Sequence, residues 1–181
     1  MNLIIGFSPF ILFALLSRLS ADLALWVAFA AAFVVTIRDF VESPSLRLLD
    51  AGSFLLFAGL ALGRGFLDPN LSLVVVRFIA ESFLFVLLGL ALAWKRPFSM
   101  EYARLDPREA AWPPQLFLKV NYRVSAAWTA AFLAMAAADG VATFNPRVPL
   151  FASIAVSVIA LGLAVTFTLR YPALAAKRLN G

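Results

Sequence analysis

The chain has 181 residues, of which 63% are hydrophobic and 14% are charged, and its mean hydropathy is +0.93. Soluble domains average about 45–50% apolar and about 25% charged residues, so both values depart in the direction of a membrane protein. The sequence contains no cysteine and no histidine, which excludes disulfides and the usual zinc, haem and iron–sulfur ligand sets and removes the commonest general base.

Six stretches are apolar enough to be membrane-spanning helices, which need about 20 residues, with a range of roughly 17–25. In chain order they cover residues 3–19, 23–37, 48–67, 71–94, 120–144 and 149–170. The first two are short, and a helical hairpin that only partly enters the bilayer is the alternative for them. Nothing basic precedes Arg18, so we expect an uncleaved first helix rather than a signal peptide. The pattern predicts an all-α membrane helix bundle of about six spans, arranged in three hairpins.

Turn-forming residues separate these stretches, and only one connection is long, at residues 95–119. Within it, the sequence DPRE places Asp106 and Pro107 where a short capped helix begins. The aromatic residues of the connection, Phe98, Tyr102 and Trp112, indicate that this connection lies at the level of the lipid headgroups. We expect residues 1–181 to form a single transmembrane domain.

The net charge of +5 comes mainly from connections between apolar stretches, which is typical of membrane topology rather than of nucleic-acid binding. Positive residues favour the cytoplasmic side, and their distribution predicts that both termini face the cytoplasm. Basic residues of the long connection are also expected to bind anionic lipid, at about 1 kcal/mol per charge. The residues assigned to this cytoplasmic or lipid contact are Lys95, Arg96, Arg104, Arg108, Lys119 and Arg123.

Charged residues inside the spans are the candidates for a site. Arg77 lies about 9 Å and Glu81 about 15 Å beyond the start of the fourth span at Leu71, so Glu81 is close to the bilayer midplane. An isolated charge there costs at least about 2.5–3.5 kcal/mol, so Glu81 must be neutral or partnered. Arg64 and Asp139 reach a similar depth, and we expect all four charged residues to form one polar layer. Three interpretations stay open: ion pairs that lock helices together, a polar cavity for an ion, a proton or a lipid headgroup, and contact with a partner subunit.

Small residues indicate where helices pack closely. Gly59 and Gly63 lie four residues apart in the third span, and Ala130 and Ala134 belong to an alanine-rich face of the fifth. Such spacing allows close backbone approach, so we expect tight packing within the bundle and find only a weak indication of dimerisation.

Catalysis has little support in the sequence. The serines within the apolar stretches have no histidine to activate them, and no glycine-rich phosphate loop or carboxylate cluster appears. We therefore expect a protein that is not an enzyme and has neither cofactor nor bound metal.

Two stretches resemble the intracellular septation protein A family, the YciB-like inner-membrane proteins, and together they cover about half of the chain. The matching positions in the first are Phe7, Pro9, Phe10, Phe13 and Asp22. Those in the second are Pro114, Asn121, Trp128 and Phe132. The chain departs from the family at NPRVPLFASIAV, which lacks the usual tryptophan and Phe–Lys pair, and near Asp139, where the family often has asparagine. The resemblance implies a bacterial inner-membrane protein associated with envelope growth and division, and it implies no catalytic residues.

We therefore expect a non-enzymatic integral inner-membrane protein that supports or scaffolds envelope and division machinery, with membrane lipids and other membrane proteins as partners. The first alternative is a small transporter or channel-like protein that uses the intramembrane Arg/Glu/Asp residues. The second is an accessory subunit of a larger membrane complex.

Overall fold

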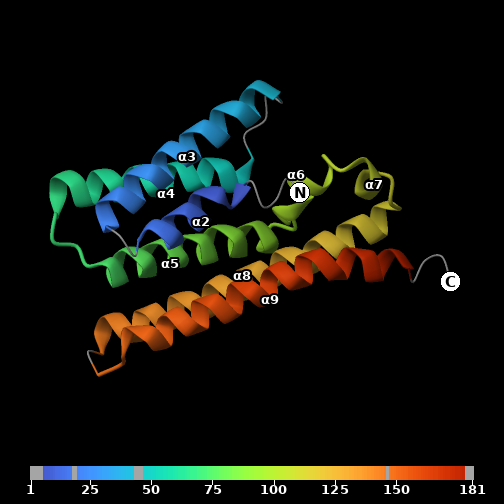
Figure 1. Ribbon diagram of the computed structural model, residues 1–181. Helices are drawn as coiled ribbons and strands as arrows, with labels where there is room; N and C mark the ends of the chain where they lie inside the picture. The colour runs from blue at the N-terminus through green and yellow to red at the C-terminus, as the bar shows by residue number, and fades with distance from the viewer. Residues whose placement is uncertain (1–5, 18–19, 43–46, 146, 178–181) are drawn as a thin grey trace. The chain divides into compact units, whose positions relative to one another are not determined.

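The computed structural model describes residues 6–17, 20–42, 47–145 and 147–177, and every regular element in them is helical (Figure 1). The α-helices are α2 (Ser8–Leu16), α3 (Ala21–Glu42), α4 (Leu48–Leu62), α5 (Leu73–Ala93), α6 (Ser99–Ala103), α7 (Pro107–Ala110), α8 (Pro114–Phe144) and α9 (Leu150–Lys177). A π-helical segment, η1 (Gly63–Leu67), continues α4. The predicted all-α class is therefore confirmed.

The described part of the chain contains 5 helices long and apolar enough to cross a membrane. They cover residues 21–41, 48–67, 73–93, 114–144 and 151–176. The second predicted span is longer than the sequence pattern indicated, so it no longer counts as short. The chain is accordingly a multi-pass membrane protein.

The first predicted span, residues 3–19, is the one without such a helix in the described residues. Within it the structure describes α2, which has 9 residues and rises about 14 Å. A hydrocarbon core is about 30 Å thick, so α2 alone is too short to cross it. Residues 3–5 and 18–19 of this stretch lie outside the described part of the chain.

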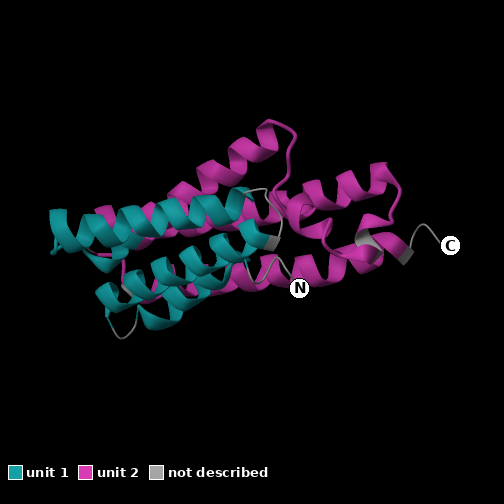
Figure 2. Ribbon diagram, turned by 90° about the horizontal axis from the view of Figure 1, so that it is seen from above, with its two compact units in different colours: residues 1–76 teal, residues 77–181 magenta. Residues whose placement is uncertain are grey.

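The chain divides into two compact units, residues 1–76 and 77–181 (Figure 2). The sequence predicts a single domain, and no linker separates the two units, because their boundary falls within the continuous helix α5. Each unit is described by itself below.

Helices α2, α3 and α4 form the first unit, and aromatic rings fill the space between them. Phe57 of α4 lies 5.0 Å from Phe10 and 5.7 Å from Phe13 of α2, measured between ring centroids. One turn earlier on α4, Phe54 lies 5.6 Å from Phe29 of α3, measured between ring centroids. Offset and tilted aromatic pairs of this kind add to the free energy of burial, and they fix which faces of the three helices meet.

In the second unit, α8 and α9 run side by side as a long hairpin (Figure 1). Trp128 of α8 donates its indole N–H to the Thr168 hydroxyl of α9 at 2.9 Å. The aromatic ring of Phe78 on α5 lies against α8 at Gly140, where an added Cβ would come within 3.0 Å of the ring. Gly140 is therefore the position that allows α5 to approach α8 closely.

Exposed apolar and buried polar residues show what surrounds these helices. On α9, Phe151, Val158 and Leu163 are exposed, whereas Ser153 and Ser157 are buried. Water would penalise so large an exposed apolar surface, but acyl chains solvate it without cost. The pattern is that of a helix whose outer face contacts lipid.

The connection between α5 and α8 contains the predicted short helix. α7 begins at Pro107, and the N–H of Ala110 donates to the Asp106 carbonyl at 2.9 Å. α8 begins at Pro114, earlier than the predicted start at residue 120, because proline is well tolerated in the first turn of a helix, where its missing N–H would have no partner. The short helix α6 was not predicted.

Candidate functional site

Arg77, in the second turn of α5, is the centre of an ionic cluster. Its Nε lies 3.0 Å from Asp139 Oδ2 on α8, and its Nη2 lies 3.9 Å from Glu81 Oε1. The same Nη2 donates a hydrogen bond of 3.0 Å to the Ser157 hydroxyl on α9. One guanidinium thus connects three helices of the second unit.

Local sequence spacing explains how the cluster forms. Arg77 and Glu81 are four residues apart and share one face of α5. Asp139 precedes Gly140, the position at which α5 and α8 approach closely, so the carboxyl group is held beside α5. Ser157 is fixed in turn, because its hydroxyl donates to the Ser153 carbonyl at 3.1 Å.

The acidic members of the cluster are buried and incompletely hydrogen-bonded. Asp139 is 0% exposed and Glu81 is 7% exposed. Both Asp139 oxygens, Glu81 Oε2 and the Thr143 hydroxyl lack a hydrogen-bond partner of good geometry, although Asp139 Oδ2 lies close to Arg77. Buried polar atoms are nearly always satisfied in native proteins, so four such oxygens in one place need an explanation.

The number of charges in the cluster offers an explanation for these unsatisfied oxygens. Two carboxyl groups share one guanidinium, so the cluster carries an excess negative charge if both acids are ionised. Two buried carboxylates close together cannot both stay ionised cheaply, and one of them then takes a proton. The arrangement can therefore hold a proton between α5 and α8.

Arg64, the fourth predicted member of the polar layer, makes its described contacts within the first unit. Its Nε lies 2.6 Å from Asp22 Oδ1 at the start of α3, and its Nη1 donates to the Leu71 carbonyl. Three of the four predicted residues are thus brought together, and Arg64 has Asp22 as its partner. It lies on the π-helical segment η1. Such segments are rare and frequently occur at functional sites.

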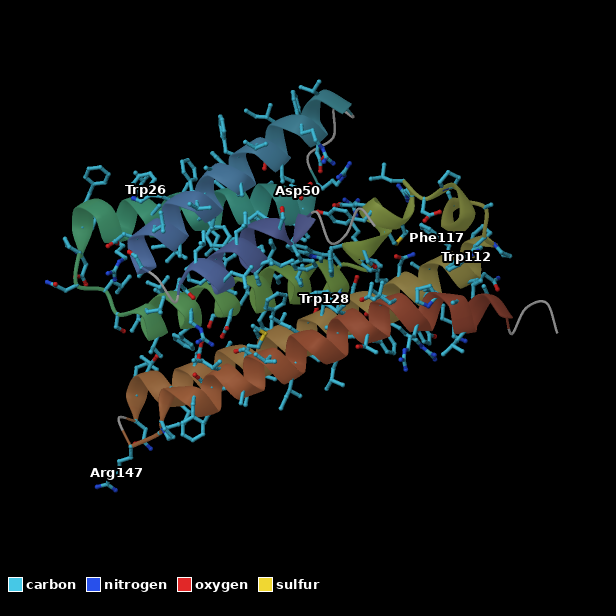
Figure 3. All side chains as sticks on the ribbon, in the orientation of Figure 1. Trp26, Asp50, Trp112, Phe117, Trp128 and Arg147 are labelled. Carbon is cyan, nitrogen blue, oxygen red and sulfur yellow. The ribbon has the colours of Figure 1, made fainter. Side chains whose placement is uncertain are left out.

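Sequence reasoning missed a second buried ionic cluster, in the first unit. Arg47 forms ion pairs with Asp39 of α3 and, at 3.8 Å, with Asp50 of α4. Arg38 also contacts Asp39, at 2.9 Å, so basic and acidic residues balance here. Asp50 is labelled on α4 in Figure 3. The spacing of Arg47 and Asp50, three residues apart at a helix start, was the available signal.

Within the described residues, the predicted packing positions show no close contact with another helix. No atom lies within 4 Å of a Cβ built at Gly59 or Gly63, and Ala130 and Ala134 are exposed. Gly59 is exposed and Gly63 is half-buried, whereas Leu56, Phe57 and Leu60 of α4 are buried, and close helix packing at the two glycines stays a prediction.

The predicted basic contact residues lie on the surface. Lys95, Arg96, Arg104, Lys119 and Arg123 are exposed, and the side chain of Arg108 lies outside the described residues. For metals, no group of three or more acidic side chains is close enough to bind an ion in the part of the chain that was described.

Comparison of the chain with protein-family models found no match, and comparisons with curated proteins and with solved structures also found none. The resemblance to the intracellular septation protein A family therefore stays a prediction.

Proposed function

We propose that this protein is an integral protein of the bacterial inner membrane that binds and releases a proton at the Glu81–Asp139 pair, as the coupling site of a small transporter or channel-like protein. The 95–119 segment and the C-terminus lie on the cytoplasmic side, where most Lys and Arg residues gather. With residues 3–19 as a sixth span, the N-terminus lies there too.

One observation carries the proposal: two buried carboxyl groups share a single guanidinium. Among the described residues, three of their four oxygens lack a hydrogen bond of good geometry, although Asp139 Oδ2 lies 3.0 Å from Arg77 Nε. A buried ion pair repays its desolvation only when additional hydrogen bonds satisfy the remaining oxygens, so this cluster is poorly designed as a purely structural pair. Intramembrane acidic residues of this kind are expensive to insert and characteristically form proton and ion pathways.

The competing interpretation is that Arg77, Glu81 and Asp139 only lock α5 against α8. The two interpretations differ in what happens when one acid is neutralised. A lock is weakened but transports nothing in either form, whereas a proton site loses its flux even if the fold is preserved.

The test uses the full chain reconstituted into liposomes that contain a pH-sensitive dye, with valinomycin and potassium setting the membrane potential. We expect an imposed pH gradient to collapse faster than in empty liposomes. Glu81→Gln and Asp139→Asn should each reduce that rate at least tenfold, because each replaces one of the two carboxyl groups that bind the proton. Replacing sodium by choline should leave the rate unchanged, since the site holds a proton.

Asp22→Asn is the matched control, because Asp22 is also a carboxyl group paired with an arginine in a span but lies outside the cluster. It should retain the wild-type rate. Unchanged flux in both Glu81→Gln and Asp139→Asn, with only thermal stability altered, would overturn the proposal and leave the structural interpretation.

A second candidate, the scaffold for envelope and division machinery, is favoured by the order of the 95–119 segment. The Ser99 hydroxyl donates to the Asn121 carbonyl at 2.9 Å, and the Ser125 hydroxyl contacts Ser99 at 3.0 Å. These buried bonds hold α6 on α8 and present the basic residues on a defined surface.

The scaffold and the accessory-subunit alternatives share one test. Extraction in a mild detergent should then yield a stoichiometric protein partner, and Ser99→Ala with Ser125→Ala should reduce its recovery. A chain that purifies alone under these conditions contradicts both alternatives.

A further inference from the structure

Arg123 and Tyr171 join α8 and α9 near the α6 end of the hairpin. Arg123 Nη1 donates to the Tyr171 hydroxyl at 2.6 Å, and the guanidinium carbon lies 5.6 Å from the centre of the same ring. Tyr171 stacks on Phe167, with 4.7 Å between centroids and 9° between planes. The guanidinium is held in one place, and most of its five N–H donors remain available.

The lengths of α8 and α9 place this contact at a membrane surface. The helices have 31 and 28 residues, whereas about 20 residues cross the hydrocarbon. Counted from the connection between them, the hydrocarbon ends near Ser125 on α8 and near Leu169 on α9. Arg123 and Tyr171 therefore both lie just beyond it, at the level of the headgroups.

The basic residues at this level form no ion pair with any residue that the structure describes. Arg38, Arg47, Arg64 and Arg77 each form an ion pair with an aspartate or glutamate. No ion pair is found for Arg123, for Lys119 one turn before it, or for Arg170 beside Tyr171 among the described residues. All three are exposed, so each is open to an anionic ligand.

We propose that Lys119, Arg123 and Arg170 form a binding site for the phosphate of an anionic phospholipid, with Tyr171 positioning Arg123. The free N–H groups of Arg123 suit a bidentate contact with phosphate oxygens. Exposed Leu169 adjoins Arg170 on the hydrocarbon side, where it meets the acyl chains. A surface on which basic residues adjoin an exposed apolar residue fits a lipid better than a free phosphate ion or an acidic peptide, because neither of these has an apolar tail.

The site rests on α8 and α9 crossing a membrane and is independent of proton binding at Glu81, so either proposal can fail alone. The probe is the full chain in mixed micelles, titrated with phosphatidylglycerol or with phosphatidylcholine, and bound lipid is counted by native mass spectrometry. The variants are Arg123→Gln, Arg123→Lys and the double variant Arg123→Gln with Arg170→Gln. The matched control is Arg147→Gln, because Arg147 is exposed and extends away from the helices at the α8–α9 connection (Figure 3).

We expect wild-type protein to retain phosphatidylglycerol in preference to phosphatidylcholine. Arg123→Gln should weaken retention about fivefold, as loss of one basic residue near a surface predicts, and the double variant should weaken it further. Arg123→Lys should also weaken it, because lysine cannot make the bidentate contact, whereas Arg147→Gln should match wild type.

Three results would overturn the proposal. The first is equal retention of the two lipids by the wild-type chain, and the second is equal loss in Arg147→Gln and Arg123→Gln, which would indicate unspecific attraction. The third is displacement of phosphatidylglycerol by millimolar inorganic phosphate or by an oligoglutamate peptide, which would show that the lipid tail contributes nothing.

Discussion

Arg77 holds two buried carboxyl groups that would otherwise have no counter-charge, with its guanidinium 3.0 Å from Asp139 and 3.9 Å from Glu81. Removing the arginine leaves both acids buried without a base. Removing Glu81 leaves the shorter pair intact and brings the cluster to one acid per base. The charge count thus predicts a large loss of stability when Arg77 is replaced and a small one when Glu81 is replaced.

We predict that Arg77→Gln lowers the free energy of unfolding by about 3–5 kcal/mol, which is the cost of breaking a buried ion pair from one side. Glu81→Gln should cost far less. Thermal unfolding in one detergent, with Arg147→Gln as the exposed control, measures both. Equal losses in Arg77→Gln and Glu81→Gln would contradict the charge count.

Lys95 gives a second prediction at this scale. It ends α5 with φ at 57°, and the bonds from Lys95 N–H to the Leu92 carbonyl and from Arg96 N–H to the Ala91 carbonyl form a Schellman motif. Glycine adopts this conformation without strain, so Lys95→Gly should raise stability by up to about 1 kcal/mol.

Ala93→Gly is the control for Lys95→Gly, because Ala93 is the last residue of α5 and is also exposed. It should lower stability, by at most about 0.5–1 kcal/mol, since glycine loses more backbone freedom on folding than alanine and Ala93 has no left-handed conformation to relieve. If both variants lose stability equally in thermal unfolding, the left-handed conformation at Lys95 is not strained.

Single residues differed in how visible they were from the sequence. Arg77 and Glu81 stand out because charge inside an apolar run is conspicuous, and Asp139 does so for the same reason. Asp22, the partner of Arg64, lies at a helix start, where an acid is ordinary. Its role depends on how α3 packs against the end of α4, which a linear pattern does not contain.

Among the helices, α8 and α9 form the most continuous contact, and a single polar bond lies near its middle. Trp128 is 5% exposed, and its indole N–H donates to the Thr168 hydroxyl, which itself donates to the Ala164 carbonyl at 2.8 Å. Figure 3 labels Trp128 on α8. A buried donor that loses its acceptor costs about 1–3 kcal/mol.

We therefore predict that Thr168→Val, which keeps the side-chain shape, lowers stability by about 1–3 kcal/mol and shifts the tryptophan fluorescence. Thr166→Val, at an exposed position of the same helix, should change neither. The bond is unimportant if thermal unfolding of the two variants in detergent is indistinguishable.

The hydrophobic runs predicted where the helices lie, but they predicted the ends of only some of them. The span at residues 48–67 agrees with the structure at both ends. α8 starts earlier and α9 ends later than the apolar runs, because both continue beyond the hydrocarbon into polar surroundings, where sequence hydropathy no longer marks a helix. Pro172 lies inside α9, although proline usually ends a helix.

For the whole molecule, membrane crossing by α8 makes a prediction about sidedness. The chain has no native cysteine, so single cysteines can be labelled without background. Ala111→Cys before α8 and Arg147→Cys after it should react with a membrane-impermeant maleimide from opposite sides of sealed vesicles. Our orientation predicts that Ala111→Cys reacts only from the cytoplasmic side, and reaction of both from one side would contradict a crossing.

Composition predicted the membrane class and the lengths of the apolar stretches predicted the helical fold, because both depend on averages over many residues. The candidate site depended on register: Arg77 meets Asp139 only because Gly140 lets α5 approach α8 at that level. The sequence also offered Gly59 and Gly63 as packing positions, and these stay a prediction, because no other described element lies within 4 Å of a Cβ built at either glycine. Function is the hardest property to predict from the sequence, because it depends on which side chain binds a proton and on which partners bind the chain.

The proposed proton site requires that either Glu81 or Asp139 carries a proton at neutral pH. Infrared spectroscopy of the reconstituted chain measures this directly, through the carbonyl band of a protonated acid and its shift in heavy water. We predict such a band in the wild-type protein, its loss in both Glu81→Gln and Asp139→Asn, and its retention in Asp22→Asn. Absence of the band in the wild-type protein, or its persistence in both cluster variants, would contradict the account.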